Sequence, residues 1–159
     1  MVDPTDYAIS FEAEVEIEDA SVAALEALAR RVLEGEGIAP GTGLAIVITD
    51  DNEVRRLNAE FLGIDEPTDV LSFPVDADDD FVGPPGEAPH LGDIAISLDT
   101  ARRQASQVGH SLQAELEHLL VHGILHLCGY DHVNGPEEEA RMRAREEHYL
   151  GDLRHLHRH

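Results

Sequence analysis

Hydrophobic and polar residues alternate strictly near the start of the chain. Over residues 8–17 every second side chain is apolar, and the positions between them carry serine or glutamate. A period of two over this length is typical of a strand with one buried face. The run 44–49 is instead continuously apolar and rich in β-branched residues, which predicts a buried strand. Two further strands are expected over 68–73, ended by Pro74, and over 91–96.

Helical spacing of apolar residues follows most of these strands. Each predicted helix begins after a residue type that favours the N-cap position or, in the last one, at a proline suited to the first turn. The N-cap candidates are Ser21, Asp50, Ser97 and Ser111, and the last helix begins at Pro136. The expected helices span about 22–35, 51–61, 98–109, 112–128 and the residues from 136 onward.

These four strands and five helices do not alternate strictly along the chain. The pattern therefore predicts an α+β fold, with a small mixed four-stranded sheet covered by about five helices. The length of 159 residues fits a single domain over 1–159, and we expect its core to span about 8–151. Residues 75–90 are rich in proline, glycine and acidic side chains and are expected to form a loop.

The charge balance is strongly acidic. Aspartate and glutamate number 33 against 11 basic residues, all arginine, which gives a formal net charge of −22. Such acidity ordinarily argues against nucleic-acid partners, because basic side chains drive phosphate binding. An alternative hypothesis is a host with a salt-rich interior, where charge repulsion is screened.

The sequence also bears on the compartment. No apolar run approaches the roughly 18 residues of a membrane span, and the first residues lack the pattern of a secretory signal. A single cysteine, Cys128, excludes an internal disulfide framework and a four-cysteine zinc site. We expect a cytoplasmic protein with no membrane segment, and we expect Cys128 to lie in the core.

The segment from His122 to His132 carries the strongest chemical signal. His122 and His126 are four residues apart on a predicted helix, so both imidazoles lie on one face and can share an ion. Gly129 can end the helix, and His132 can then return to the same ion. Three imidazoles leave one position for water, as in a catalytic zinc site. With ten histidines some such pairs arise by chance, but the third histidine beyond Gly129 favours one Zn²⁺ per chain, bound at a helix end.

The histidine and glycine spacing equals that of the metzincin proteases, H-E-x-x-H-x-x-G-x-x-H. Gly123 stands where those enzymes carry their general-base glutamate. Without that carboxylate, peptide hydrolysis by the same route is not expected. A metallopeptidase-like hydrolase remains an alternative.

Three further stretches accompany the histidine motif in order: Leu57-Asn58 with residues 65–74 (DEPTDVLSFP), residues 91–97 (LGDIAIS), and Met142 to Leu150. Together with Glu115 to His132 they resemble the bacterial rRNA maturation RNase YbeY family over roughly residues 44–150. The resemblance implies a zinc-dependent, single-strand-specific endoribonuclease that acts in small-subunit rRNA maturation and ribosome quality control. It implies His122, His126 and His132 as ligands, and rRNA, the small ribosomal subunit and assembly factors as partners.

One position departs from the family pattern. The family commonly has an arginine, considered important for activity, where this chain has Leu62. An arginine can hold phosphate or stabilise charge in the transition state, and leucine can do neither. Arg102 or Arg103 could substitute for it. The departure keeps open a third hypothesis, a non-catalytic metal-binding ribosome assembly factor.

The expected reaction is attack of metal-activated water on a phosphodiester. No general base is identified, and Asp131 is a candidate. His118 is expected near the metal ligands rather than as one of them. Asp93 is a candidate partner of a ligand imidazole, and Ser72 is expected either to contact substrate or to bond to backbone.

Overall fold

The computed structural model describes residues 7–18, 20–74, 90–129 and 136–150. Asp131 and His132, the candidate base and the third predicted ligand, lie outside this part of the chain. The elements, in chain order, are β1 (Ala8–Ala13), α1 (Val22–Gly35), β2 (Gly43–Thr49), α2 (Asp51–Leu62), β3 (Val70–Pro74), β4 (His90–Ser97), α3 (Leu98–Val108), α4 (Leu112–Leu127) and α5 (Pro136–Leu150).

The four strands form one mixed sheet in the order β1-β2-β4-β3. β1 pairs with β2 and β2 pairs with β4 in parallel, whereas β3 runs antiparallel to β4 and forms one edge. The α+β class and the mixed four-stranded sheet predicted from the sequence are thus confirmed. The edge position of β3 leaves it beside the helix that carries the histidine motif.

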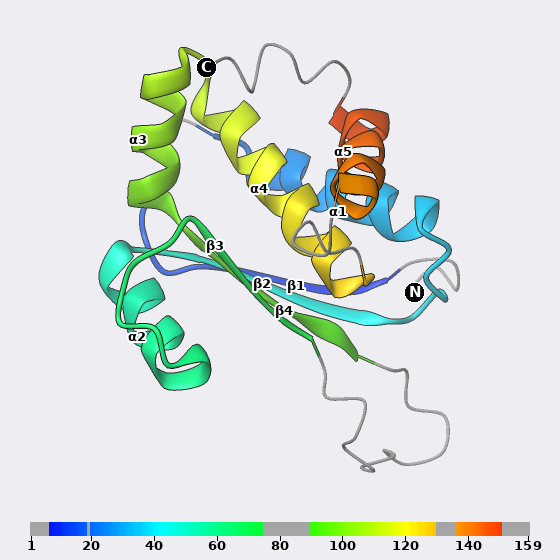
Figure 1. Cartoon of the computed structure of the whole chain (residues 1–159), viewed down its shortest axis with the longest axis horizontal. Coiled ribbons are helices and arrows are strands. Elements are labelled where there is room, and N and C mark those ends of the chain that lie inside the picture. The colour runs from blue at the N-terminus through cyan, green and yellow to red at the C-terminus, as the bar shows by residue number, and fades with distance from the viewer. Residues whose placement is uncertain (1–6, 19, 75–89, 130–135, 151–159) are drawn as a thin grey trace.

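The helices cover the two faces of the sheet unequally. α1, α3, α4 and α5 lie on one side and α2 lies alone on the other, as Figure 1 shows. The main core fills the space between the sheet and α4, where Leu44, Ile46, Ile94 and Ile96 meet Leu120. A smaller cluster that includes Val54, Leu71 and Ala95 lies under α2.

Two strands differ from expectation. β2 is not buried throughout: Leu44, Ile46 and Ile48 face the main core, while Ala45 and Val47 between them are partly exposed. The strand lies inside the sheet, but α2 covers little of its second face. β1 ends at Ala13 instead of continuing to residue 17, because its partner β2 ends at Thr49 and the chain then enters α2.

The four predicted N-caps are confirmed. The side chains of Ser21, Asp50, Ser97 and Ser111 each accept a hydrogen bond from the backbone N–H three residues later. Each cap satisfies one of the N–H groups that a helix start leaves without an intrahelical partner. Within the described ranges, no helix combines the length and the apolar character that crossing a membrane requires.

Candidate metal site and cleft

α4 is the central helix of the molecule and is apolar on nearly all sides. Ten of its sixteen residues are buried against the sheet or the neighbouring helices. His118, His122 and His126 form a partly exposed line along it, because residues four apart in a helix lie above one another. The helix ends as predicted: Gly129 follows with φ +104°, a conformation that glycine adopts without steric cost.

His122 and His126 direct the same ring atom toward each other. Their Nε2 atoms are 3.1 Å apart, so one ring donates a hydrogen bond and the other accepts it. Two imidazole nitrogens that converge in this way are a suitable donor pair for Zn²⁺. Among the described residues, no three His, Cys, Asp or Glu side chains are grouped to hold a metal ion. The structure therefore brings together two of the three predicted ligands.

His118 faces a different partner. Its Nε2 atom lies 3.1 Å from Oε2 of Glu146 on α5, and the other carboxylate oxygen of Glu146 lies 3.5 Å from Nδ1 of His122. Burial of Glu146 favours its neutral form, but the hydrogen bonds and charges of the two histidines outweigh burial and lower its pKa to about 2. His118 thus lies beside the predicted ligands, as expected, and Glu146 is a neighbour that the sequence analysis missed. Within α5, Glu146 was one acidic residue among many, and only its spacing of four from the buried Met142 gave a signal.

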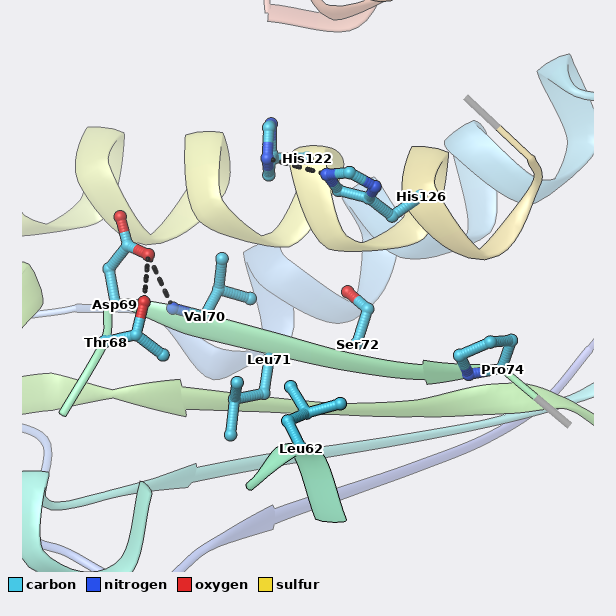
Figure 2. Close-up of a pocket in the computed structure, with 9 residues that line it drawn as sticks. All are labelled: Leu62, Thr68, Asp69, Val70, Leu71, Ser72, Pro74, His122 and His126. Carbon is cyan, nitrogen blue, oxygen red and sulfur yellow. Dashed lines mark hydrogen bonds between the residues drawn. The ribbon is translucent and has the colours of Figure 1, made fainter. Parts of the chain in front are cut away.

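A cleft of about 590 Å³ opens between α4 and the edge strand β3. Figure 2 shows His122 and His126 on one wall of it and the residues of β3 on the other. The lining residues are Leu62, Thr68, Asp69, Val70, Leu71, Ser72, Pro74, His122 and His126. The converging imidazoles are therefore accessible from a cavity large enough to admit a ligand.

Gly123 sets the distance between α4 and the sheet. A Cβ atom at this position would lie 3.2 Å from two carbon atoms of Ile94 and 3.2 Å from Oγ of Ser72. The Ser72 hydroxyl also donates a hydrogen bond of 3.2 Å to the carbonyl of Gly123. Position 123 therefore faces the sheet at close contact, and a glutamate there would not reach the cleft without displacing β3 and β4.

The loop before β3 forms the start of the second wall and is fixed by two polar side chains. The amide of the buried Asn58 donates to the carbonyl of Glu66, 2.9 Å away. The Asp69 carboxylate accepts hydrogen bonds from the backbone N–H of Val70 and from the side chain of Gln104 on α3. Asp69 lines the cleft and was also missed from sequence, because nothing local distinguishes it from a turn-forming aspartate.

Leu62 lines the cleft and is 52% exposed, at the position where the YbeY-like pattern commonly has an arginine. The neighbouring arginines are engaged elsewhere. Arg55 pairs with Asp65, and Arg56 pairs with Glu53 and Glu60. Arg103 pairs with Asp51 at the start of α2. No arginine is among the described residues that line the cleft.

Three other candidates are placed as follows. Ser72 bonds to helix backbone, which is one of the two expectations, and it also lines the cleft. Asp93 contacts neither His122 nor His126, the two predicted ligands that the structure describes: it lies on the α2 side of the sheet and pairs with His90 at 2.9 Å. Strand alternation explains the difference, since its neighbour Ile94 takes the position that faces α4.

Cys128 packs against the main core as expected, and burial together with Glu36 raises its pKa to about 11.

One known protein family covers nearly the whole chain. The family model described as Endoribonuclease YbeY matches residues 8–154. The chain belongs to the YbeY family. The match includes the histidine motif, the β3 signature and α5, so all the elements that surround the cleft lie within the region shared with the family.

Individual YbeY relatives extend the match. The chain is 51% identical over 129 residues to the endoribonuclease YbeY of Roseiflexus castenholzii, covering 81% of both proteins. It is 50% identical over 127 residues to that of Chloroflexus aurantiacus, covering 79% of this chain and 82% of the relative. The solution structure of TM1509 from Thermotoga maritima is similar in fold, with a TM-score of 0.55 at 26% identity, over 92% of this chain and 91% of that one. The resemblance inferred from the motifs is therefore confirmed.

Proposed function

We propose that this protein is a zinc-dependent endoribonuclease that cleaves single-stranded RNA, and that its substrate is rRNA during maturation and quality control of the small ribosomal subunit. The observation that carries the proposal is the pair of Nε2 atoms of His122 and His126, 3.1 Å apart on the wall of an open cleft. The relatives named endoribonuclease YbeY support the reaction class. The small subunit and its assembly factors are the proposed partners.

The donor set fits one zinc ion. His122 and His126 would hold it, with His132 as the third ligand predicted from the sequence. Bound zinc lowers the pKa of water toward ~7 and places positive charge beside a phosphate. Two imidazoles at one wall of a cleft leave the opposite wall for the substrate.

The residues that line the cleft suit a single strand of RNA. The wall formed by β3 and the loop before it includes the apolar side chains of Val70, Leu71 and Pro74 as well as the polar groups of Thr68, Asp69 and Ser72. The base faces of unpaired RNA present apolar surface, and the base edges and ribose hydroxyls present hydrogen-bonding groups. Asp69 and Ser72 are each held in place by bonds to neighbouring elements, so their orientation does not depend on substrate.

A second candidate function is a ribosome assembly factor that keeps its metal for stability and does not cut RNA. Leu62 favours it, because no described arginine lines the cleft to stabilise a phosphate. A peptidase is disfavoured, because position 123 packs on the sheet and offers no carboxylate to the cleft.

The test uses the purified full chain. Zinc content by mass spectrometry should be close to one per chain and should fall in His126→Ala. Chelator-sensitive cleavage of single-stranded RNA, with double-stranded RNA and casein left intact, is the expected result. Chelator-sensitive cleavage of casein with intact RNA would establish a peptidase instead. Stoichiometric zinc without any cleavage would favour the assembly factor.

A further inference from the structure

α5 places a buried carboxylate against the histidine face of α4. Glu146 is 7% exposed, and Met142, one turn earlier on the same face of α5, is 1% exposed. The two Glu146 oxygens take different partners: Oε2 contacts Nε2 of His118 at 3.1 Å, and Oε1 contacts Nδ1 of His122 at 3.5 Å. A carboxylate this deeply buried is costly unless it is hydrogen-bonded, and these two imidazoles supply the donors.

The contact determines which nitrogen of His122 carries a proton. An ionised carboxylate only accepts hydrogen bonds, so the Nδ1 atom that faces it must be the donor. In a neutral imidazole the other nitrogen, Nε2, then carries a lone pair that can accept a hydrogen bond or bind a metal ion. That Nε2 atom is the one that faces Nε2 of His126, 3.1 Å away.

We propose that Glu146 is a positioning residue of the metal site. It holds the proton of His122 on Nδ1, fixes the orientation of the ring, and so directs the Nε2 lone pair toward the point where the two α4 imidazoles converge. Carboxylates that accept a hydrogen bond from a ligand histidine have this effect in metalloproteins generally. His118 holds the second oxygen of Glu146 and thereby sets the rotation of the carboxylate. The inference rests on the proposed zinc site, but the tautomer is a property of the metal-free chain.

A purely structural role for Glu146 is the competing explanation. α5 is also attached to α1 through Arg145, which pairs with Glu36 at 2.6 Å. Since this second attachment does not involve the histidines, α5 has an anchor that remains when Glu146 is changed. Loss of stability alone therefore does not distinguish the two roles, and the test needs a readout at the His122 ring.

The experiment compares Glu146→Ala and Glu146→Gln with Glu147→Gln. Glu147 is the exposed next residue of α5, so its variant removes the same charge away from the site. Long-range ¹H–¹⁵N correlation spectra of the metal-free proteins report the tautomer of each histidine, and His122→Ala identifies the His122 signals. Zinc affinity is measured separately by competition with a chromophoric chelator.

The expected result is that wild type and Glu147→Gln hold His122 as the Nδ1–H tautomer. In Glu146→Ala the ring should show a mixture of tautomers, and zinc should bind about 10- to 100-fold more weakly. Glu146→Gln preserves the side-chain volume, and it decides the case if the alanine variant fails to fold. An Nε2–H tautomer in wild type, or wild-type tautomer and zinc affinity in a folded Glu146 variant, would overturn the proposal. A wild-type chain that binds no zinc but shows the Glu146-dependent tautomer would refute the proposed zinc function and leave the positioning role intact.

Discussion

A single glycine distinguishes this site from that of the proteases with the same histidine spacing. The sequence shows only that a glutamate is missing at position 123, and the structure shows why none is accommodated. Ile94 and the Ser72 hydroxyl occupy the space that a side chain would need. α4 therefore approaches the sheet closely, and at position 123 it presents no carboxylate to the cleft.

Enlarging position 123 should destabilise the fold. Gly123→Glu would force methylene groups and a charge against Ile94, and overpacking alone costs about 1–3 kcal/mol. We expect a loss of at least that size in urea unfolding and no gain of peptidase activity. Gly123→Ala is the milder comparison, because its gain in helix propensity, about 1 kcal/mol, opposes a contact of 3.2 Å. Wild-type stability of Gly123→Glu would show that the sheet and α4 are not held together as described.

Replacing Leu62 with arginine should raise the rate of RNA cleavage. Leu62→Arg adds a guanidinium to the cleft, where it can form bidentate hydrogen bonds to a phosphate. Removing one donor that stabilises a transition state costs 10²–10³ in rate, so we expect restoring one to raise RNA cleavage by about tenfold or more. Ile64→Arg is the matched control, because Ile64 is 48% exposed and is not among the cleft residues. Equal rates in both variants, or no cleavage in any of them, would count against catalysis at this cleft.

At the scale of elements, α2 and α3 are joined at their N-terminal ends by one carboxylate. Oδ1 of Asp51 accepts hydrogen bonds from the hydroxyls of Ser97 (2.5 Å) and Thr100 (2.7 Å), and Arg103 lies 2.9 Å from Oδ2. Burial favours the neutral acid, but these three donors outweigh burial and lower the Asp51 pKa below 3.8. The negative charge also lies in the first turn of α2, where the helix dipole favours it.

The Asp51 contacts should make stability depend on pH. Because the folded-state pKa is depressed, their contribution is complete above the unfolded value near 3.8 and is lost as the pH falls through the folded value. Asp51→Asn should therefore cost about 1–2 kcal/mol at pH 7, and the difference from wild type should shrink below pH 4. Glu147→Gln, an exposed charge change, should show no such convergence. Chemical unfolding at several pH values measures this, and a pH-independent difference would contradict the assignment.

How far the sequence predicts these elements depends on the range of the interaction. Caps and helix ends were predictable, since Ser97 or Gly129 acts on residues within one turn. The end of β1 at Ala13 was not predictable, because it depends on its partner strand β2. That strand ends at Thr49, 36 residues later in the chain. Glu146 was missed for the same reason: its partners lie on another helix, and its own segment resembles a solvated acidic surface. The face of the sheet from which the Asp93 side chain projects could not be predicted without the strand register.

For the whole molecule, the relevant property is the net charge of −22 in a member of a family named for cutting RNA. Most arginines of the described ranges are already paired with carboxylates. These pairs involve Arg55, Arg56, Arg103, Arg141, Arg143 and Arg145. The remaining carboxylates repel one another, and this repulsion destabilises the folded state at low ionic strength.

Added salt should therefore stabilise the protein. The Debye length falls from ~10 Å at 0.1 M to ~3 Å at 1 M, so repulsion between surface carboxylates is largely removed over that range. We expect the melting temperature to rise by several degrees from 0.1 to 1 M KCl, as the hypothesis of a salt-adapted host requires. Differential scanning calorimetry measures the rise. Maximal stability at low salt would remove that hypothesis.

RNA binding should also depend on salt in an unusual way. Proteins that bind single strands through arginine and lysine release counterions, and log K falls with log salt by about 0.7 per phosphate contact. Here no described arginine lines the cleft, and the acidic surface repels the strand. We therefore expect affinity for an unstructured oligonucleotide, measured by fluorescence anisotropy, to stay level or to rise between 0.1 and 1 M KCl. Leu62→Arg should add a negative slope of about 0.7, since one phosphate contact is gained, and Ile64→Arg should not. A steep fall in affinity for the wild-type chain would mean that cations outside the described cleft bind the strand, and the cleft would then not be the main RNA-binding surface.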